Sequence, residues 1–94
     1  MNILFVHSDE KKTKEIKDFF SHSDLKITYT QFKEFDNDLQ YNFINFDLMF
    51  IELIGNDEIK IEKIKKYKKY SESLFVPIIY TFEDINFDLL SKNF

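Results

Sequence analysis

The sequence predicts an α/β fold in which a parallel β-sheet is covered by helices. Short apolar segments of strand length alternate along the chain with longer segments whose apolar residues recur every three or four positions. Three of the short segments are continuously apolar, which is typical of strands that a parallel sheet buries on both faces. Strands that alternate with helices connect by right-handed crossovers, so we expect one sheet with helices on both faces.

Length and composition indicate one small domain over residues 1–94. The hydrophobic fraction is 44%, with 12 Phe and 5 Tyr, which is ample material for a core. The chain has no Cys, so disulfides, thiolate metal sites and cysteine nucleophiles are excluded. We find neither a signal peptide at residues 1–6 nor an apolar run that could span a bilayer, and we therefore expect a cytoplasmic protein without a membrane partner.

The charged residues argue against nucleic acid as a direct partner. The formal net charge is -4, and the 13 basic residues are all lysines. Arginine is the usual bidentate ligand of phosphate and guanine, and this chain has none. Gly55 is the only glycine, so the chain cannot form a glycine-rich phosphate loop.

The first half of the chain predicts two strands and two helices. Residues 3–6 are apolar and are followed by polar residues, which indicates a buried strand. Ser8 or Asp9 can cap a helix over residues 10–20. Residues 25–30 alternate between apolar and polar side chains, as in a half-buried strand at a sheet edge. Large apolar side chains then recur at helical spacing and predict a second helix: Phe32, Phe35, Leu39 and Phe43.

The second half of the chain continues the alternation. Residues 47–52 form an apolar segment that ends on an acid, which predicts a third buried strand. Turn residues around Gly55 precede a helix over residues 57–70, with lysines on its outer face. Residues 74–81 predict a fourth strand, and a fourth helix begins near residue 83.

Functional side chains in a parallel sheet gather where the strands end, at their carboxyl ends. Carboxylates and a hydroxyl from different strands could hold Mg²⁺ there, because this ion prefers oxygen ligands. The sequence places polar groups at each strand end: residues 7–10, Thr30 and Gln31, Glu52, and Thr81.

Three segments at these strand ends resemble the receiver domain of bacterial two-component response regulators. They are residues 3–9, 46–53 and 76–81, and their order and spacing suit that family. The resemblance implies a flavodoxin-like sheet with the strand order 2-1-3-4, from which the family's fifth strand is missing. It also leads us to expect that the chain is an N-terminal fragment of a longer protein.

The resemblance assigns roles to the ends of the third and fourth strands. Glu52 stands where the family has its phospho-accepting Asp, and Thr81 matches the Thr or Ser that moves onto the phosphoryl group. Glutamate is one methylene longer and is not the family's acceptor, and the family's Lys would fall beyond residue 94. Glu52 is therefore a solvated strand-end acid, a pocket group, or a mimic of a phosphorylated Asp. Thr81 is a switch residue or a plain strand-end hydroxyl.

The family's Mg²⁺-binding acid pair falls on His7 and Ser8, one residue before Asp9 and Glu10. Asp9 and Glu10 are therefore the candidate acidic pocket, and Asp9 with Glu52 the candidate ligands of a weakly bound Mg²⁺. The alternative is that Asp9 and Glu10 cap the first helix and supply its first-turn charges. We expect no site built on histidine, because the second histidine lies on the far side of that helix.

These features predict a degenerate receiver domain that is not an enzyme and needs no cofactor. Its expected partner is a protein, either a histidine kinase or an output domain. Three alternatives stay open: a Mg²⁺-dependent receiver with a shifted acidic site, a small flavodoxin-like protein that binds flavin or a nucleotide, and a structural dimerisation domain. The fourth strand would leave an open edge, so a homodimer could form there.

Overall fold

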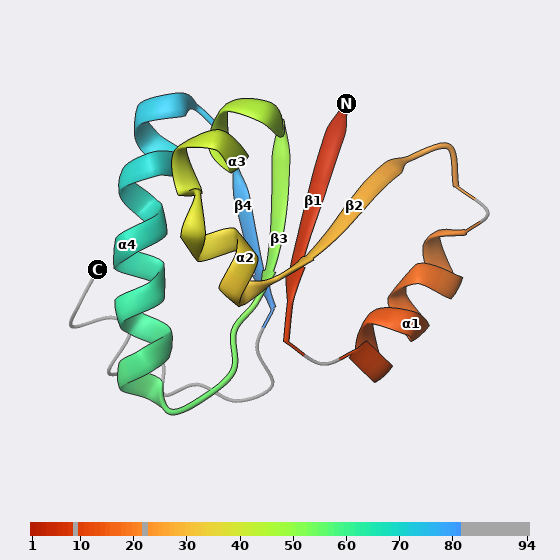
Figure 1. Ribbon diagram of the computed structural model, residues 1–94, viewed down its shortest axis with the longest axis horizontal. Coiled ribbons are helices and arrows are strands. Elements are labelled where there is room, and N and C mark those ends of the chain that lie inside the picture. The colour runs from red at the N-terminus through yellow and green to blue at the C-terminus, as the bar shows by residue number, and fades with distance from the viewer. Residues whose placement is uncertain (9, 22, 82–94) are drawn as a thin grey trace.

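The computed structural model describes residues 1–8, 10–21 and 23–81 of the chain (Figure 1). In this part of the chain the strands are β1 (Asn2–His7), β2 (Lys26–Gln31), β3 (Leu48–Glu52) and β4 (Ile78–Thr81). The helices are α1 (Glu10–Phe20), α2 (Phe32–Asn37), α3 (Leu39–Asn45) and α4 (Asp57–Leu74). The predicted helix that begins near residue 83 lies outside the described residues.

The strands form one sheet in the order β2-β1-β3-β4, and every neighbouring pair is parallel. Helices α2, α3 and α4 lie on one side of this sheet and α1 on the other (Figure 1). The predicted fold class, a flavodoxin-like α/β arrangement with strand order 2-1-3-4, is therefore confirmed. Because the strands are parallel, their carboxyl ends meet along one side, which we call the carboxyl edge.

The main core lies between the sheet and the helices α2, α3 and α4. Alternate residues of β1 and β3 point into this layer, where they meet aromatic side chains from the helices. Removing each large apolar side chain from water contributes roughly 1.5–3 kcal/mol. The buried members of the core are Leu4, Val6, Phe35, Leu39, Phe43, Met49, Ile51, Leu53, Tyr67 and Val76.

The opposite face of the sheet, towards α1, has a smaller apolar layer. Ile3 and Phe5 are buried there, and the Phe5 ring centre lies 5.8 Å from that of Tyr29 and 6.3 Å from that of Phe50. The face is more open towards β4, where Ile79 is 47% exposed. We call this side of the sheet the α1 face.

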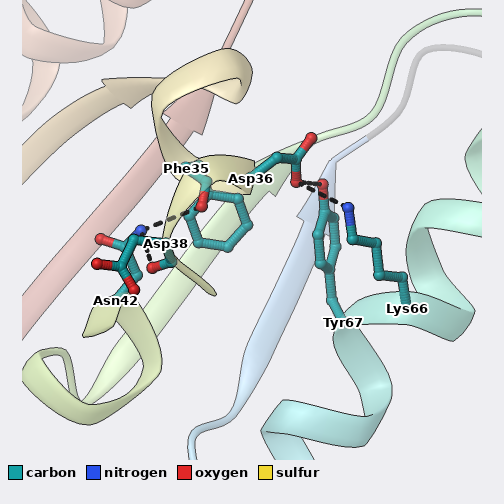
Figure 2. Close-up of polar contacts among 6 residues, drawn as sticks. All are labelled: Phe35, Asp36, Asp38, Asn42, Lys66 and Tyr67. Atoms are coloured by element: carbon teal, nitrogen blue, oxygen red, sulfur yellow. Dashed lines mark hydrogen bonds and ion pairs between the residues drawn. The ribbon is translucent and has the colours of Figure 1, made fainter. Parts of the chain in front are cut away.

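The segment predicted as one helix over residues 32–43 consists of two helices that meet at Asp38. Asp38 has φ of -147° and ψ of 70°, and its carboxylate accepts a hydrogen bond from the Tyr41 N–H at 3.2 Å. The Asn42 amide donates to the carbonyls of Phe35 and Asp38 and so joins the two helices (Figure 2). Apolar spacing did not predict this break, because a carboxylate that caps the next helix causes it.

Helix α2 is fastened to α4 by polar and aromatic contacts. The Tyr67 hydroxyl donates to Oδ1 of Asp36 at 2.6 Å, and the Lys66 Nζ lies 3.7 Å from the same oxygen (Figure 2). Lys63 Nζ lies 3.9 Å from the centre of the Phe32 ring, which is a cation–π contact. Burial raises the pKa of Tyr67, and the hydrogen bond and charge of Asp36 raise it further.

Helix α4 is longer than predicted, and β4 is correspondingly shorter. The helix continues to Leu74 and ends at Phe75, which has a left-handed conformation with φ of 56° and ψ of 40°. The Ser71 hydroxyl donates to the Val76 carbonyl at 2.6 Å, and the Val76 N–H donates to the Ser71 carbonyl at 3.1 Å. Residues 74–77 were predicted as strand because they are mostly apolar. The hydrogen bonds between Ser71 and Val76 instead extend the helix to Leu74.

Candidate functional site

Neighbouring strands bring His7, Glu52 and Thr81 together at the carboxyl edge. Glu52 on β3 pairs in register with Thr81 on β4. On the other side of β3, Val6 pairs with Ile51, so His7 follows beside Glu52 one residue further along. Paired residues of parallel strands point to the same face of a sheet, so these side chains share the α1 face.

Glu52 is buried at this edge. It is 8% exposed, and its Oε1 has no hydrogen-bond partner among the described residues. A buried carboxylate oxygen without a partner is costly, so such atoms mark positions where a further group completes the hydrogen bonding. At this exposure Glu52 is not a solvated strand-end acid, and its role as a pocket group or as a mimic of a phosphorylated Asp stays a prediction.

His7 is also buried, although the sequence indicated no site built on histidine. It is 7% exposed, and its Nδ1 has no hydrogen-bond partner within the described part of the chain. The sequence did contain a signal for this burial. His7 follows Ile3 and Phe5 at two-residue steps, and side chains at that spacing share one face of a strand.

Thr81 and Ser8 differ from this buried pair because both are exposed. The Thr81 carbonyl accepts a hydrogen bond from the Leu53 N–H at 2.8 Å, which fixes the end of β4 beside β3. Ser8 follows directly after β1. The two positions to which the resemblance assigns an acid pair therefore carry one buried imidazole and one exposed hydroxyl.

The candidate acidic pocket is not placed by the structure. Asp9 lies outside the described residues, and the side chain of Glu10, the first residue of α1, is not described either. Among the described strand ends, β1, β3 and β4 contribute one carboxylate, that of Glu52. The described residues contain no group of three or more His, Asp or Glu side chains that could hold a metal ion. Of the two candidate Mg²⁺ ligands, the structure therefore places Glu52 and not Asp9.

A cavity of about 480 Å³ lies next to this edge, between α1 and the strands β1 and β2. Lys17 Nζ lies 4.8 Å from the centre of the Tyr29 ring, and the Thr30 hydroxyl donates to the Glu34 carboxylate at 3.3 Å. Burial raises the pKa of the Tyr29 phenol. The walls of the cavity include His7, Lys14, Lys17, Tyr29, Thr30 and Glu34.

The sequence analysis did not identify this cavity as a candidate site. Its walls come from four elements, β1, α1, β2 and α2, and no sequence motif links the residues that line it. Thr30 was predicted at a strand end, but the sequence assigned no role to the lysines of α1. Only the packing of α1 beside β2 brings these residues together.

No protein-family model matches the chain, and no curated protein or solved structure matches it either. The fold therefore defines the class of protein: a small α/β domain with a parallel, flavodoxin-like sheet. None of the helices within the described residues is long and apolar enough to cross a membrane. The carboxyl edge and the neighbouring cavity are the candidate functional regions of this domain.

Proposed function

We propose that this chain is a receiver-like signalling module of the cytoplasm that binds a protein partner and does not accept a phosphoryl group. The observation that carries the proposal is the register of Glu52 with Thr81 at the ends of β3 and β4. In the receiver family, these strand ends carry the phospho-acceptor and the switch residue. The strand order is the one that the resemblance implies, which supports the same proposal.

The residues beside Glu52 argue against phosphoryl transfer. That reaction depends on a metal ion that neutralises charge on the phosphoryl group. His7 stands next to Glu52, where the family has an acid, and an imidazole is a poor ligand for a hard ion such as Mg²⁺. The exposed Ser8 supplies no carboxylate either. The module therefore works without a cofactor and is not an enzyme.

The partner in this proposal is a protein. A histidine kinase or an output domain fits a module that keeps the receiver fold but not its chemistry. A second copy of the chain is a further partner, because β4 is an edge strand of the sheet within the described residues.

The test is an amide NMR titration with millimolar Mg²⁺, first alone and then with beryllofluoride, which mimics a phosphoryl group on a receiver. We expect no change in the signals of Glu52, Leu53 and Thr81, because His7 and Ser8 stand where the family has its acid pair. Shifts centred on those residues would overturn the proposal and restore a phosphate-responsive receiver.

A variant that carries the family's acids serves as a positive control for this titration. The triple variant His7→Asp, Ser8→Asp, Glu52→Asp restores the acids at the three family positions, and we expect it to shift with Mg²⁺ where the parent does not. Its amide spectrum first establishes that it folds, and the double variant Ser8→Asp, Glu52→Asp, which keeps the buried His7, replaces it if it does not.

A further inference from the structure

We propose that the cavity between α1 and the carboxyl ends of β1 and β2 binds a small hydroxylated anion, such as a sugar phosphate or a hydroxy acid. The proposal goes beyond the receiver-like function, because the phosphoryl site of that family lies at the ends of β1, β3 and β4. It depends on the charges of the cavity walls, on one buried unpartnered side chain and on the size of the cavity.

Two lysines give the cavity its preference for an anion. Lys14 and Lys17 lie three residues apart on α1, so they are neighbours on one face of the helix, and both line the cavity. Neither forms a salt bridge with an acid in the described part of the chain. Lys17 is held over the Tyr29 ring at 4.8 Å, which places its ammonium group at the wall between α1 and β2.

His7 adds a buried polar side chain to the cavity wall. It lines the same cavity, it is 7% exposed, and its buried Nδ1 has no hydrogen-bond partner among the described residues. Leaving such a group unsatisfied costs about 1–3 kcal/mol, so native structures seldom keep one without a partner. Nδ1 itself is covered by protein, so a ligand oxygen reaches it only when the imidazole ring turns towards the cavity.

Glu34 determines which kind of anion fits. Its carboxylate lies on the α2 wall of the cavity and accepts a hydrogen bond from the Thr30 hydroxyl at 3.3 Å. A carboxylate repels the charged end of an anion but accepts hydrogen bonds from hydroxyl groups. The cavity therefore favours a ligand with its charge towards Lys14 and Lys17 and its hydroxyls towards Glu34.

The size of the cavity agrees with such a ligand. Its volume of about 480 Å³ lies within the range of roughly 300–1,000 Å³ that small-molecule sites occupy. A single inorganic ion would leave most of this space empty.

The test is an amide NMR titration of the folded protein with three separate probes: inorganic phosphate, ribose 5-phosphate and citrate. We expect ribose 5-phosphate or citrate to shift the signals of His7, Lys14, Tyr29 and Thr30, and to do so at lower concentration than inorganic phosphate. The tighter of the two organic probes distinguishes a phosphate ligand from a carboxylate ligand.

Three variants test the roles of the walls. Lys14→Ala and Lys17→Ala should each weaken binding of the tighter probe about tenfold, which is the usual effect of losing one charge-assisted hydrogen bond. Glu34→Gln should reduce the preference for the hydroxylated probe over inorganic phosphate. Lys26→Ala is the matched control, because this exposed lysine lies at the other end of β2 and should leave binding unchanged.

Two results would overturn the proposal. One is a folded parent protein whose cavity signals do not move with any probe at millimolar concentration. The other is binding that Lys14→Ala, Lys17→Ala and Lys26→Ala weaken equally, since that would mean general attraction to surface charge. All three lysines are exposed, so these variants should fold like the parent.

Discussion

Tyr67 carries a hydroxyl group into the main core and is paired there by one carboxylate, that of Asp36 on α2. The buried position of Tyr67 and the neighbouring charge of Asp36 both disfavour a tyrosinate, so the pKa of Tyr67 is raised above its ordinary value near 10. Burial also raises the pKa of Tyr80 to about 12. In the unfolded chain both phenols would titrate near pH 10. These two residues therefore link the stability of the fold to alkaline pH.

The protein should lose stability as pH rises above about 10, because the unfolded chain then releases phenolic protons that the folded state retains. Each such tyrosine contributes a slope of about 1.4 kcal/mol per pH unit while only the unfolded state titrates. Urea unfolding between pH 8 and pH 11 measures this slope. In Tyr67→Phe the slope should be smaller by the contribution of one tyrosine.

Tyr41→Phe is the control for this measurement. Tyr41 is 59% exposed on α3, so its replacement should leave the slope as it is in the parent. Equal slopes in the parent and both variants would contradict the assignment to Tyr67.

At the residue scale, the sequence predicted which residues stand at the strand ends, but it did not predict how buried they are. It placed Glu52 and Thr81 at the ends of two strands, where the structure pairs them. It did not predict that Glu52 and His7 are buried side by side, because burial at a strand end depends on what packs over it. The lysines of α1 gave no signal, since exposed and cavity-lining lysines have the same helical spacing.

Among the elements, α4 shows how one backbone conformation sets the limit of a helix. Asn56 caps its beginning by accepting a hydrogen bond from the Ile59 N–H at 2.9 Å, and Asp57 and Glu58 place acids in its first turn. Its end depends on Phe75, which is left-handed and 90% exposed. A left-handed conformation costs a residue with a Cβ roughly 1–2 kcal/mol, and the Phe75 side chain gains little from packing in return.

Phe75→Gly should therefore stabilise the protein by about 0.5–1 kcal/mol. The gain from relieving the left-handed conformation exceeds the entropy that glycine adds to the unfolded chain. Chemical denaturation with urea measures the change in the free energy of unfolding. Phe75→Ala removes the same aromatic ring but keeps the Cβ, so it should lack this gain. A Phe75→Gly protein no more stable than Phe75→Ala would show that the conformation is not strained.

Element boundaries were the part of the fold that the sequence predicted least well. Apolar spacing located every helix and strand of the described residues, because that spacing reports which side faces the core. It did not report the break at Asp38 or the extension of α4 to Leu74. Both depend on single hydrogen bonds and backbone angles, which leave the apolar pattern unchanged.

For the whole molecule, apolar patterning agrees with the positions of β1, β2 and β3 in the sheet, whereas β4, also predicted as a buried strand, has no buried residue and lies at one side. The continuous apolar segments of β1 and β3 occupy the centre of the sheet, and the alternating β2 occupies one side. The sequence therefore contained most of the topology. Within the described residues β4 forms the other side, where its outer backbone groups are open to another strand.

A homodimer through β4 should appear as a concentration-dependent molar mass in analytical ultracentrifugation. Ile79→Lys should weaken it, because a lysine on an edge strand disfavours pairing with a second strand. Ile79 is 47% exposed, so the change should not disturb the fold. Ile44→Lys is the matched control, since Ile44 is 60% exposed on the helix α3 and belongs to no strand. A parent protein that stays monomeric at every concentration would exclude this dimer.

Helix α2 begins at the residue that directly follows β2, and it is six residues long. Within that length it contributes Glu34 to the cavity near α1 and Asp36 to the hydrogen bond with Tyr67 on α4. One turn of backbone is thus shared between the two sides of the sheet. An occupant of the cavity that moved the backbone at Glu34 would also move Asp36, the partner of Tyr67, two residues further along the same helix. The two faces of this domain are therefore joined through α2 as well as through the sheet.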